Sequence, residues 1–240
     1  MELYIVLTIT IFTSALIQGM TGFGSALVAM AILPLFLPVR TVTPLVLLVG
    51  LLLNIIIFVR FHQHFDMKKL FPIIIGAAAG VPIGVYGLKM IDERIIKLVL
   101  GTVLFSYSSY SLTGRKLSGS FSAKWGYAFG FLSGCLGGAI NTSGPPVVIH
   151  ATLQRWSQHE VVTTLQSFFI MSGLYTLVMH SLHGLFTMEV LRYWAILVPV
   201  QVAGVFLGMF LHTRINEELF RRIVYVLLIA FSVVIFYSIF

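Results

Sequence analysis

The sequence has few charged residues and a single cysteine. Asp, Glu, Lys and Arg make up 10% of the 240 residues, hydrophobic types make up 58%, and the mean hydropathy is +1.01. Soluble domains carry roughly 25% charged residues, so the composition predicts a polytopic membrane protein. The lone Cys135 excludes a disulfide framework and a cysteine-based metal site. No cofactor and no metal are expected.

Acidic side chains are missing from the interior of the long apolar stretches. The eight carboxylates lie at or near segment ends: Glu2, Asp66, Asp92, Glu93, Glu160, Glu189, Glu217 and Glu218. Buried carboxylates are the usual cation or proton relays of membrane proteins, so their absence argues against a cation transporter. There is also no P-loop, so the energy for any transport must come from a gradient or from a partner. The net charge of +7 is attributed to loop residues facing anionic lipid, not to nucleic-acid binding.

Apolar segments run at about 3–37, 41–59, 71–89, 95–112, 125–153, 161–180, 190–211 and 219–240. The first begins beside Glu2 instead of a basic region and exceeds signal-peptide length, so it is expected to be part of the structure. The fold class is therefore all-α, in a single transmembrane domain over 1–240. The polar connector 113–124 divides the chain into two halves, 1–113 and 123–240, which are predicted to be homologous repeats.

Matching residues support the duplication. Gly19 and Gly22 correspond to Gly134 and Gly137 at one offset, and the stretch GVPIGVYGLKMIDERIIK corresponds to GVFLGMFLHTRINEELFR at another. Gly80, Gly84 and Gly87, and Gly204 and Gly208 in the second stretch, are expected to be close helix-packing contacts, because their spacing is small-xxx-small and no polar cluster accompanies them.

The orientation of the repeats follows from segment length and loop charge. Segment 3–37 has 35 residues, about 52 Å as one helix, whereas the hydrocarbon core is about 30 Å thick. If both long segments are re-entrant, ten of the 15 Lys and Arg residues fall on one side; if both cross, the division is seven to eight. The positive-inside rule favours re-entry. Each half then has one Gly-broken or re-entrant helix plus three transmembrane helices, and the repeats are inverted. A tilted or bent full crossing stays open.

Two polar, glycine-containing stretches interrupt the long apolar segments. They are QGMTGFGS, Gln18 to Ser25, and SGCLGGAINTSGPP, Ser133 to Pro146. Proline is favoured in the first turn of a helix, and Ser and Asn are good N-caps, so each stretch predicts a new helix start within the membrane. A helix start presents unpaired N–H groups and a positive dipole end, which together favour an anion. The predicted substrate-binding residues are Gln18, Gly19, Thr21, Gly22, Phe23, Gly24, Ser25, Asn141, Thr142, Ser143, Gly144, Pro145 and Gln166.

Three further polar residues are pathway candidates. Asn54 makes either an interhelical hydrogen bond or a contact with the transported species. His150 could carry a proton, although a structural hydrogen bond is favoured, and Arg155 either attracts anions at a cavity mouth or anchors the cytoplasmic interface. His180 and His183 without a third ligand make a poor metal site.

With these residues in view, the chain resembles the sulfite exporter TauE/SafE family of membrane transporters. The resemblance rests on IQGMTGFGSALVAMAILPLFLP and FLSGCLGGAINTSGPPVVIHATL, and it covers essentially the whole chain. It implies a protein of the bacterial plasma membrane that moves small sulfur-containing or organic anions, such as sulfite, sulfonates or taurine. It specifies neither the substrate nor the direction. Proton coupling and a homodimer are also left open.

The leading functional hypothesis is a secondary anion transporter that works by alternating access around two helix starts. A second hypothesis is an intramembrane serine hydrolase, with Ser143 as nucleophile and His150 or His180 as base. Against it, Ser143 lies in N-T-S-G-P and not in a G-x-S-x-G elbow. A third hypothesis is a passive anion channel or a non-transporting scaffold.

Overall fold

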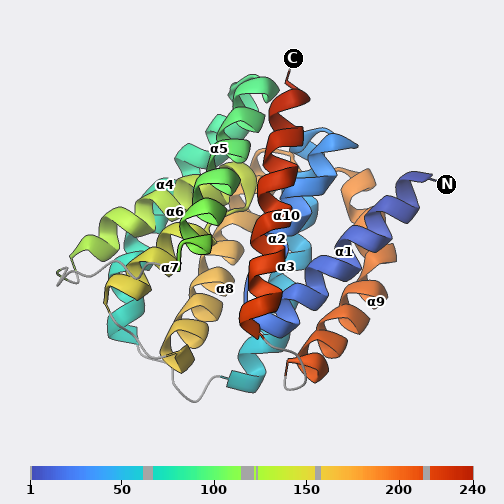
Figure 1. Ribbon diagram of the computed structural model, residues 1–240. Helices are drawn as coiled ribbons and strands as arrows, with labels where there is room; N and C mark the ends of the chain where they lie inside the picture. Colours follow the sequence, from blue (N-terminus) through green and yellow to red (C-terminus); the bar gives the residue numbers. More distant parts are fainter. Residues whose placement is uncertain are drawn as a thin grey trace.

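The computed structural model describes residues 2–61, 67–114, 122, 124–154, 158–212 and 217–239, and within them every regular element is helical. Figure 1 shows the helices as one bundle, with the C-terminus at the top and the N-terminus at the upper right. The helices of the first half are α1 (Glu2–Thr21), α2 (Ser25–Ile32), the short 3-10 helix η1 (Leu33–Leu35), α3 (Val39–Phe61), α4 (Met67–Met90) and α5 (Glu93–Leu112). Those of the second half are α6 (Trp125–Ile140), α7 (Gly144–Leu153), α8 (Gln158–Leu182), α9 (Met188–Leu211) and α10 (Glu217–Tyr237).

Seven of these helices are long and apolar enough to cross a membrane: α1, α3, α4, α5, α8, α9 and α10. The prediction of a polytopic all-α membrane protein is therefore confirmed. Three helices in each half, α3–α5 and α8–α10, are the full-length ones expected to follow the broken segment. Large apolar side chains cover their outer surfaces, as is required of helices that face lipid.

Both long apolar segments are interrupted where the glycine stretches predicted. The first segment divides into α1 and α2 around residues 22–24, and the second into α6 and α7 around residues 141–143. The two cases differ in length. α6 and α7 have 16 and 10 residues, as expected of partial helices, whereas α1 has 20 residues and is about 30 Å long, enough to cross by itself. The depth of the breaks in the bilayer stays a prediction.

Glycines bring α4 and α6 into backbone contact. A Cβ added at Gly80 would lie 2.2 Å from the carbonyl oxygen of Phe131, and one at Gly84 would lie 2.1 Å from that of Cys135. The approach is mutual, because a Cβ at Gly134 on α6 would lie 2.5 Å from the carbonyl oxygen of Ala77 on α4. Only glycine permits such close backbones.

The same kind of contact joins α1 and α9. A Cβ at Gly204 would lie 2.7 Å from the Phe12 carbonyl oxygen, and one at Gly208 would lie 2.2 Å from that of Leu16. The packing role predicted for these glycines and for Gly80 and Gly84 is thus confirmed. Gly87 is the one glycine of this predicted set that differs. A Cβ at Gly87 would lie 3.4 Å from the end of the Ile91 side chain and near no other helix that the structure describes, so the packing role predicted for it is wrong.

The packing of the two halves is reciprocal. α1 lies along α9 and α6 lies along α4, so each interrupted helix packs against a helix of the other half. α3 packs against α8, and α5 packs against α10. The buried apolar core runs through α1, α2, α3, α5, α9 and α10, and a smaller cluster joins α4, α7 and α8. This arrangement leaves the two breaks facing a shared interior space.

Candidate functional site

Two glycines with positive φ form the first break. Gly22 has φ 80° and its N–H donates to the Gln18 carbonyl at 2.8 Å; Gly24 has φ 106° and precedes α2. The first intrahelical bond of α2 runs from the Val28 N–H to the Gly24 carbonyl, at 3.1 Å. The N–H groups of residues 25, 26 and 27 therefore have no acceptor within their own helix and point out of its start.

Asn141 forms the second break by ending α6 in the left-handed conformation, with φ 50°. Asparagine tolerates this conformation better than most residues do. The Asn141 N–H donates to the Gly137 carbonyl at 3.0 Å and the Thr142 N–H to the Leu136 carbonyl at 3.4 Å, which closes the end of α6. α7 then begins at Gly144, followed by Pro145 and Pro146, which have no N–H. This helix start offers fewer backbone donors than α2 and depends more on its hydroxyl side chains.

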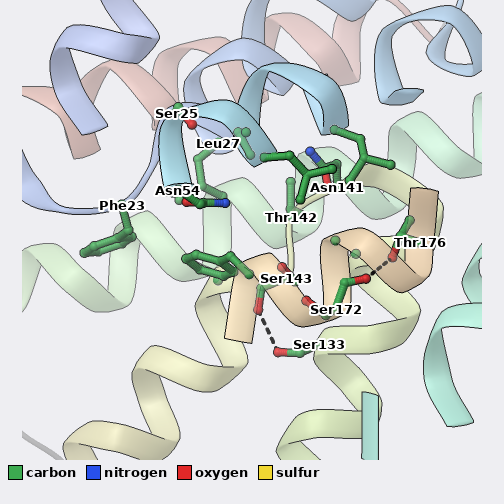
Figure 2. Close-up of a pocket in the computed structure, with 18 of the residues that line it drawn as sticks. Phe23, Ser25, Leu27, Asn54, Ser133, Asn141, Thr142, Ser143, Ser172 and Thr176 are labelled. Atoms are coloured by element: carbon green, nitrogen blue, oxygen red, sulfur yellow. Dashed lines mark hydrogen bonds between the residues drawn. The ribbon is translucent and has the colours of Figure 1, made fainter. Parts of the chain in front are cut away.

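The two breaks line the same cavity, with a volume of about 60 Å³. On this measure one water molecule needs about 10–15 Å³, so the cavity has room for a few waters or a small oxyanion. Figure 2 shows Phe23, Ser25 and Leu27 on one side and Asn141, Thr142 and Ser143 on the other. The lining residues are Gln18, Phe23, Gly24, Ser25, Ala26, Leu27, Leu47, Gly50, Leu51, Asn54, Val81, Ser133, Gly134, Gly137, Asn141, Thr142, Ser143, Gly144, Phe169, Ser172, Gly173 and Thr176.

Neutral polar groups line this cavity, and none of its lining residues is charged. Ser25 donates its hydroxyl to the Gln18 side-chain oxygen, and Gln18 Nε2 donates to Asn54 Oδ1 at 2.7 Å. This chain of bonds fixes the start of α2 to α1 and α3. The amide nitrogen of Asn54 points toward the cavity (Figure 2).

Thr142 carries a buried hydroxyl that faces the cavity without a partner in the described part of the chain. Its residue is 1% exposed, it lines the cavity, and its hydroxyl oxygen has no hydrogen-bond partner among the described residues. A buried hydroxyl without a partner is costly, and most buried polar groups in proteins are satisfied by protein, water or ligand. A polar species that entered the cavity could supply the partner that this hydroxyl lacks.

Several lining residues were not predicted from the sequence. Ser133 on α6 donates to the Ser143 carbonyl at 2.6 Å and braces the second break. Ser172 and Thr176 on α8 donate to carbonyls four residues earlier, at 2.6 and 2.8 Å, and reach the cavity beside Gly173. The spacing of the α8 residues could have indicated a shared role, because Phe169, Ser172, Gly173 and Thr176 lie on one helical face.

Some predicted site residues support the breaks without lining the cavity. The Thr21 hydroxyl lies within hydrogen-bond distance of the carbonyls of Ile17 and Phe23, at 2.8 and 2.6 Å. Gln166 on α8 donates its side-chain amide to the carbonyl of Gly22 and so connects the second half to the first break. Pro145 is buried in the first turn of α7. A substrate-binding role for these residues and for Gly22 stays a prediction.

Gly19 and His150 lie elsewhere. A Cβ at Gly19 would lie 2.4 Å from the Val205 carbonyl oxygen, which makes this glycine part of the α1–α9 contact. His150 is buried on α7 against α6, with its ring 5.4 Å from that of Phe129. Neither residue lines the cavity, whereas Asn54 does. Arg155 lies outside the described residues.

No group of three His, Cys, Asp or Glu side chains that could hold a metal occurs within the residues that the structure describes.

A bundle of membrane-length helices with a polar cavity between two interrupted helices is typical of the class of membrane transporters. The chain matches the family described as Sulfite exporter TauE/SafE over residues 7–235 and belongs to that family. It is therefore a multi-pass membrane transport protein and not an enzyme, and the serine hydrolase hypothesis is set aside. No curated protein and no solved structure gave a significant match to the chain.

Proposed function

We propose that the protein is a secondary transporter for small anions of the sulfite and sulfonate class, and that the anion binds between the starts of α2 and α7. The observation that carries this proposal is an uncharged cavity lined by both helix starts, with the unpartnered hydroxyl of Thr142 inside it. Family membership supports the anion class.

Electrostatics favours an anion over a cation in this cavity. Each helix start contributes roughly half a positive charge, and the amides of residues 25–27 are donors without an intrahelical acceptor. Carboxylates, the side chains that would stabilise a cation, do not line the cavity. An oxyanion can therefore accept bonds from backbone amides, from Thr142 and from the Asn54 amide, with no lysine or arginine beside it.

The cavity walls also suit a sulfonate. Leu47, Leu51, Val81 and Phe169 supply apolar surface to the same cavity. An anion with one charged end and a short hydrocarbon end would place its oxygens at the breaks and its carbon against these side chains. Sulfite has no hydrocarbon end and would contact only the polar groups at the breaks.

The reciprocal packing supports two equivalent repeats, 1–113 and 123–240, and the loop charges favour an inverted relation between them. In this scheme α1 corresponds to α6, α3 to α8, α4 to α9 and α5 to α10. The pairing of α1 with α9 then corresponds to that of α6 with α4, while α3–α8 and α5–α10 are pairs of equivalent helices. A pseudo-two-fold axis through the cavity accounts for all of these pairings.

Alternating access is the mechanism that this symmetry supports. One half rocks against the other around the fixed anion, and the glycine contacts of α1–α9 and α4–α6 are where the halves slide. The place of action is the bacterial plasma membrane, with the anion and lipid as partners. A carrier of this kind shows saturable flux and counterflow, which a passive channel does not.

The test is anion binding and flux with hydroxyl-deletion variants. Thr142→Val removes an unpartnered hydroxyl from the cavity and should weaken binding of sulfite and of methanesulfonate by about tenfold or more, because a hydrogen bond to a charged group contributes about 1.5–3 kcal/mol. Ser25→Ala removes the bond that holds the start of α2 to Gln18 and should also weaken binding, because the backbone amides of residues 25–27 are then less firmly placed. Thr102→Val is the matched control, since Thr102 on α5 is exposed and only bonds its own helix at Leu98.

Binding is measured by calorimetry on the purified protein, and flux in proteoliposomes. The proposal fails if both cavity variants bind like the control, or if the wild-type protein responds to simple cations and to no anion.

A further inference from the structure

His180 is a buried titratable side chain next to the proposed anion cavity. It is 0% exposed and lies on α8, four residues after Thr176, which lines the cavity. Four residues of helix correspond to roughly 6 Å along the axis. Ser172, Thr176 and His180 therefore continue one polar line from the cavity toward the C-terminal end of α8.

The two ring nitrogens of His180 have different surroundings. Nε2 lies 3.0 Å from the carbonyl oxygen of Gly138, in the last turn of α6 before the second break. A carbonyl only accepts, so Nε2 carries the hydrogen and Nδ1 of the neutral ring holds a lone pair. Nδ1 is buried and has no hydrogen-bond partner among the described residues. A proton added there has no acceptor among these residues.

Few charges surround this ring. His183, on the same helix, is the titratable group that acts on it electrostatically, and its Nδ1 lies 2.8 Å from the Met179 carbonyl oxygen. α6 presents the uncharged stretch ending in Gly138, and Phe186 packs at a centroid distance of 6.1 Å. α3 also packs against α8, and its Arg40 donates to the carbonyls of Leu88 and Ile91. No carboxylate lines the neighbouring cavity to balance a protonated ring.

We infer that His180 is the residue that couples protonation to anion binding, and that an anion in the cavity supplies the negative charge that the protonated ring lacks. This inference rests on the proposed function and deepens it. By thermodynamic reciprocity, protonation of His180 then tightens anion binding and anion binding draws a proton onto His180. His150, the sequence-based candidate for this role, lies against α6 away from the cavity lining.

The experiment measures anion affinity against pH for wild-type protein and His180→Gln, with methanesulfonate and sulfate as probes. Neither anion changes its charge between about pH 8 and about pH 4, a range that covers the titration of a buried histidine as well as that of an exposed one. Glutamine keeps a donor for the Gly138 carbonyl but cannot take up a proton. We expect wild-type affinity to rise about fivefold or more as the pH falls, and His180→Gln to lose most of this rise. His150→Gln is the control and should keep it.

Calorimetry of the wild-type protein in buffers of different ionisation enthalpy gives a readout that needs no variant. It should show net proton uptake on anion binding, and melting curves without anion confirm that His180→Gln is folded. Equal pH dependence in wild-type protein and His180→Gln, loss of the dependence in His150→Gln instead, or absence of proton uptake would overturn this inference alone. Failure of the wild-type protein to bind any anion at any pH would overturn the proposed function itself.

Discussion

At the scale of single residues, the backbone conformation at the breaks places the polar groups. Gly22 and Gly24 have positive φ, a region that residues with a side chain rarely enter. Gln166 reaches the same break from α8 and bonds the Gly22 carbonyl. The first helix start is therefore held by contacts from both halves of the chain.

Gly22→Ala tests whether this conformation is needed for binding. The substitution places a Cβ at φ 80°, with Val162 Cγ2 at 3.3 Å, and the left-handed region costs about 1–2 kcal/mol for a residue with a side chain. Gly114→Ala is the matched control, because Gly114 has φ 62° and open space around it. Both variants should melt at lower temperature than the wild-type protein, and only Gly22→Ala should also bind sulfite more weakly. Equal anion affinity in the two variants would show that the first break is not part of the site.

Sequence patterns at this scale identified the breaks but not the whole lining. Glycine, proline and hydroxyl residues inside an apolar run cannot continue an ordinary helix, so Gly24 and Asn141 could be located from the sequence. Ser172, Gly173 and Thr176 sit in a regular helix, and only the packing of α8 beside both breaks brings them to the cavity. Gly19 belongs to the motif by position, yet its direction toward α9 depends on how α1 packs.

At the scale of helices, glycine faces determine how closely α4 and α6 approach. Gly80→Ala should destabilise the protein, because its Cβ would lie 2.2 Å from the Phe131 carbonyl oxygen and 2.9 Å from the Cys135 nitrogen, both backbone atoms. Overpacking of this kind costs about 1–3 kcal/mol, so the apparent melting temperature in detergent should fall by several degrees.

Gly87→Ala is the matched control on the same helix. Its Cβ would meet only the Ile91 side chain at 3.4 Å, and alanine favours a helix over glycine by about 1 kcal/mol, so melting should be unchanged or slightly higher. A fall in melting temperature as large as that of Gly80→Ala would contradict the assignment of this contact. The small-xxx-small spacing predicted that these glycines pack, but spacing alone could not separate Gly87 from Gly80, since that depends on where α6 crosses.

At the scale of the whole molecule, composition and segment length were enough to predict the helical membrane fold. Apolar runs of about 20 residues can satisfy their backbone in lipid only as helices, and the long helices follow those runs closely. The pairing of α1 with α9 and of α6 with α4 could not be read from the sequence, because equivalent glycines in two repeats allow pairing within a half as well as between halves. The pairing of helices between the two halves brings both breaks to one cavity, which is the proposed anion site.

The location of a bound anion tests this account most directly. Selenate, an oxyanion whose selenium scatters anomalously, can be diffused into crystals of the protein and located from its anomalous signal. The account predicts a peak between α2 and α7, with selenate oxygens about 3 Å from the amides of residues 25–27 and from the Thr142 hydroxyl. A peak at another place in the protein, together with an empty cavity between the two helix starts, would contradict it.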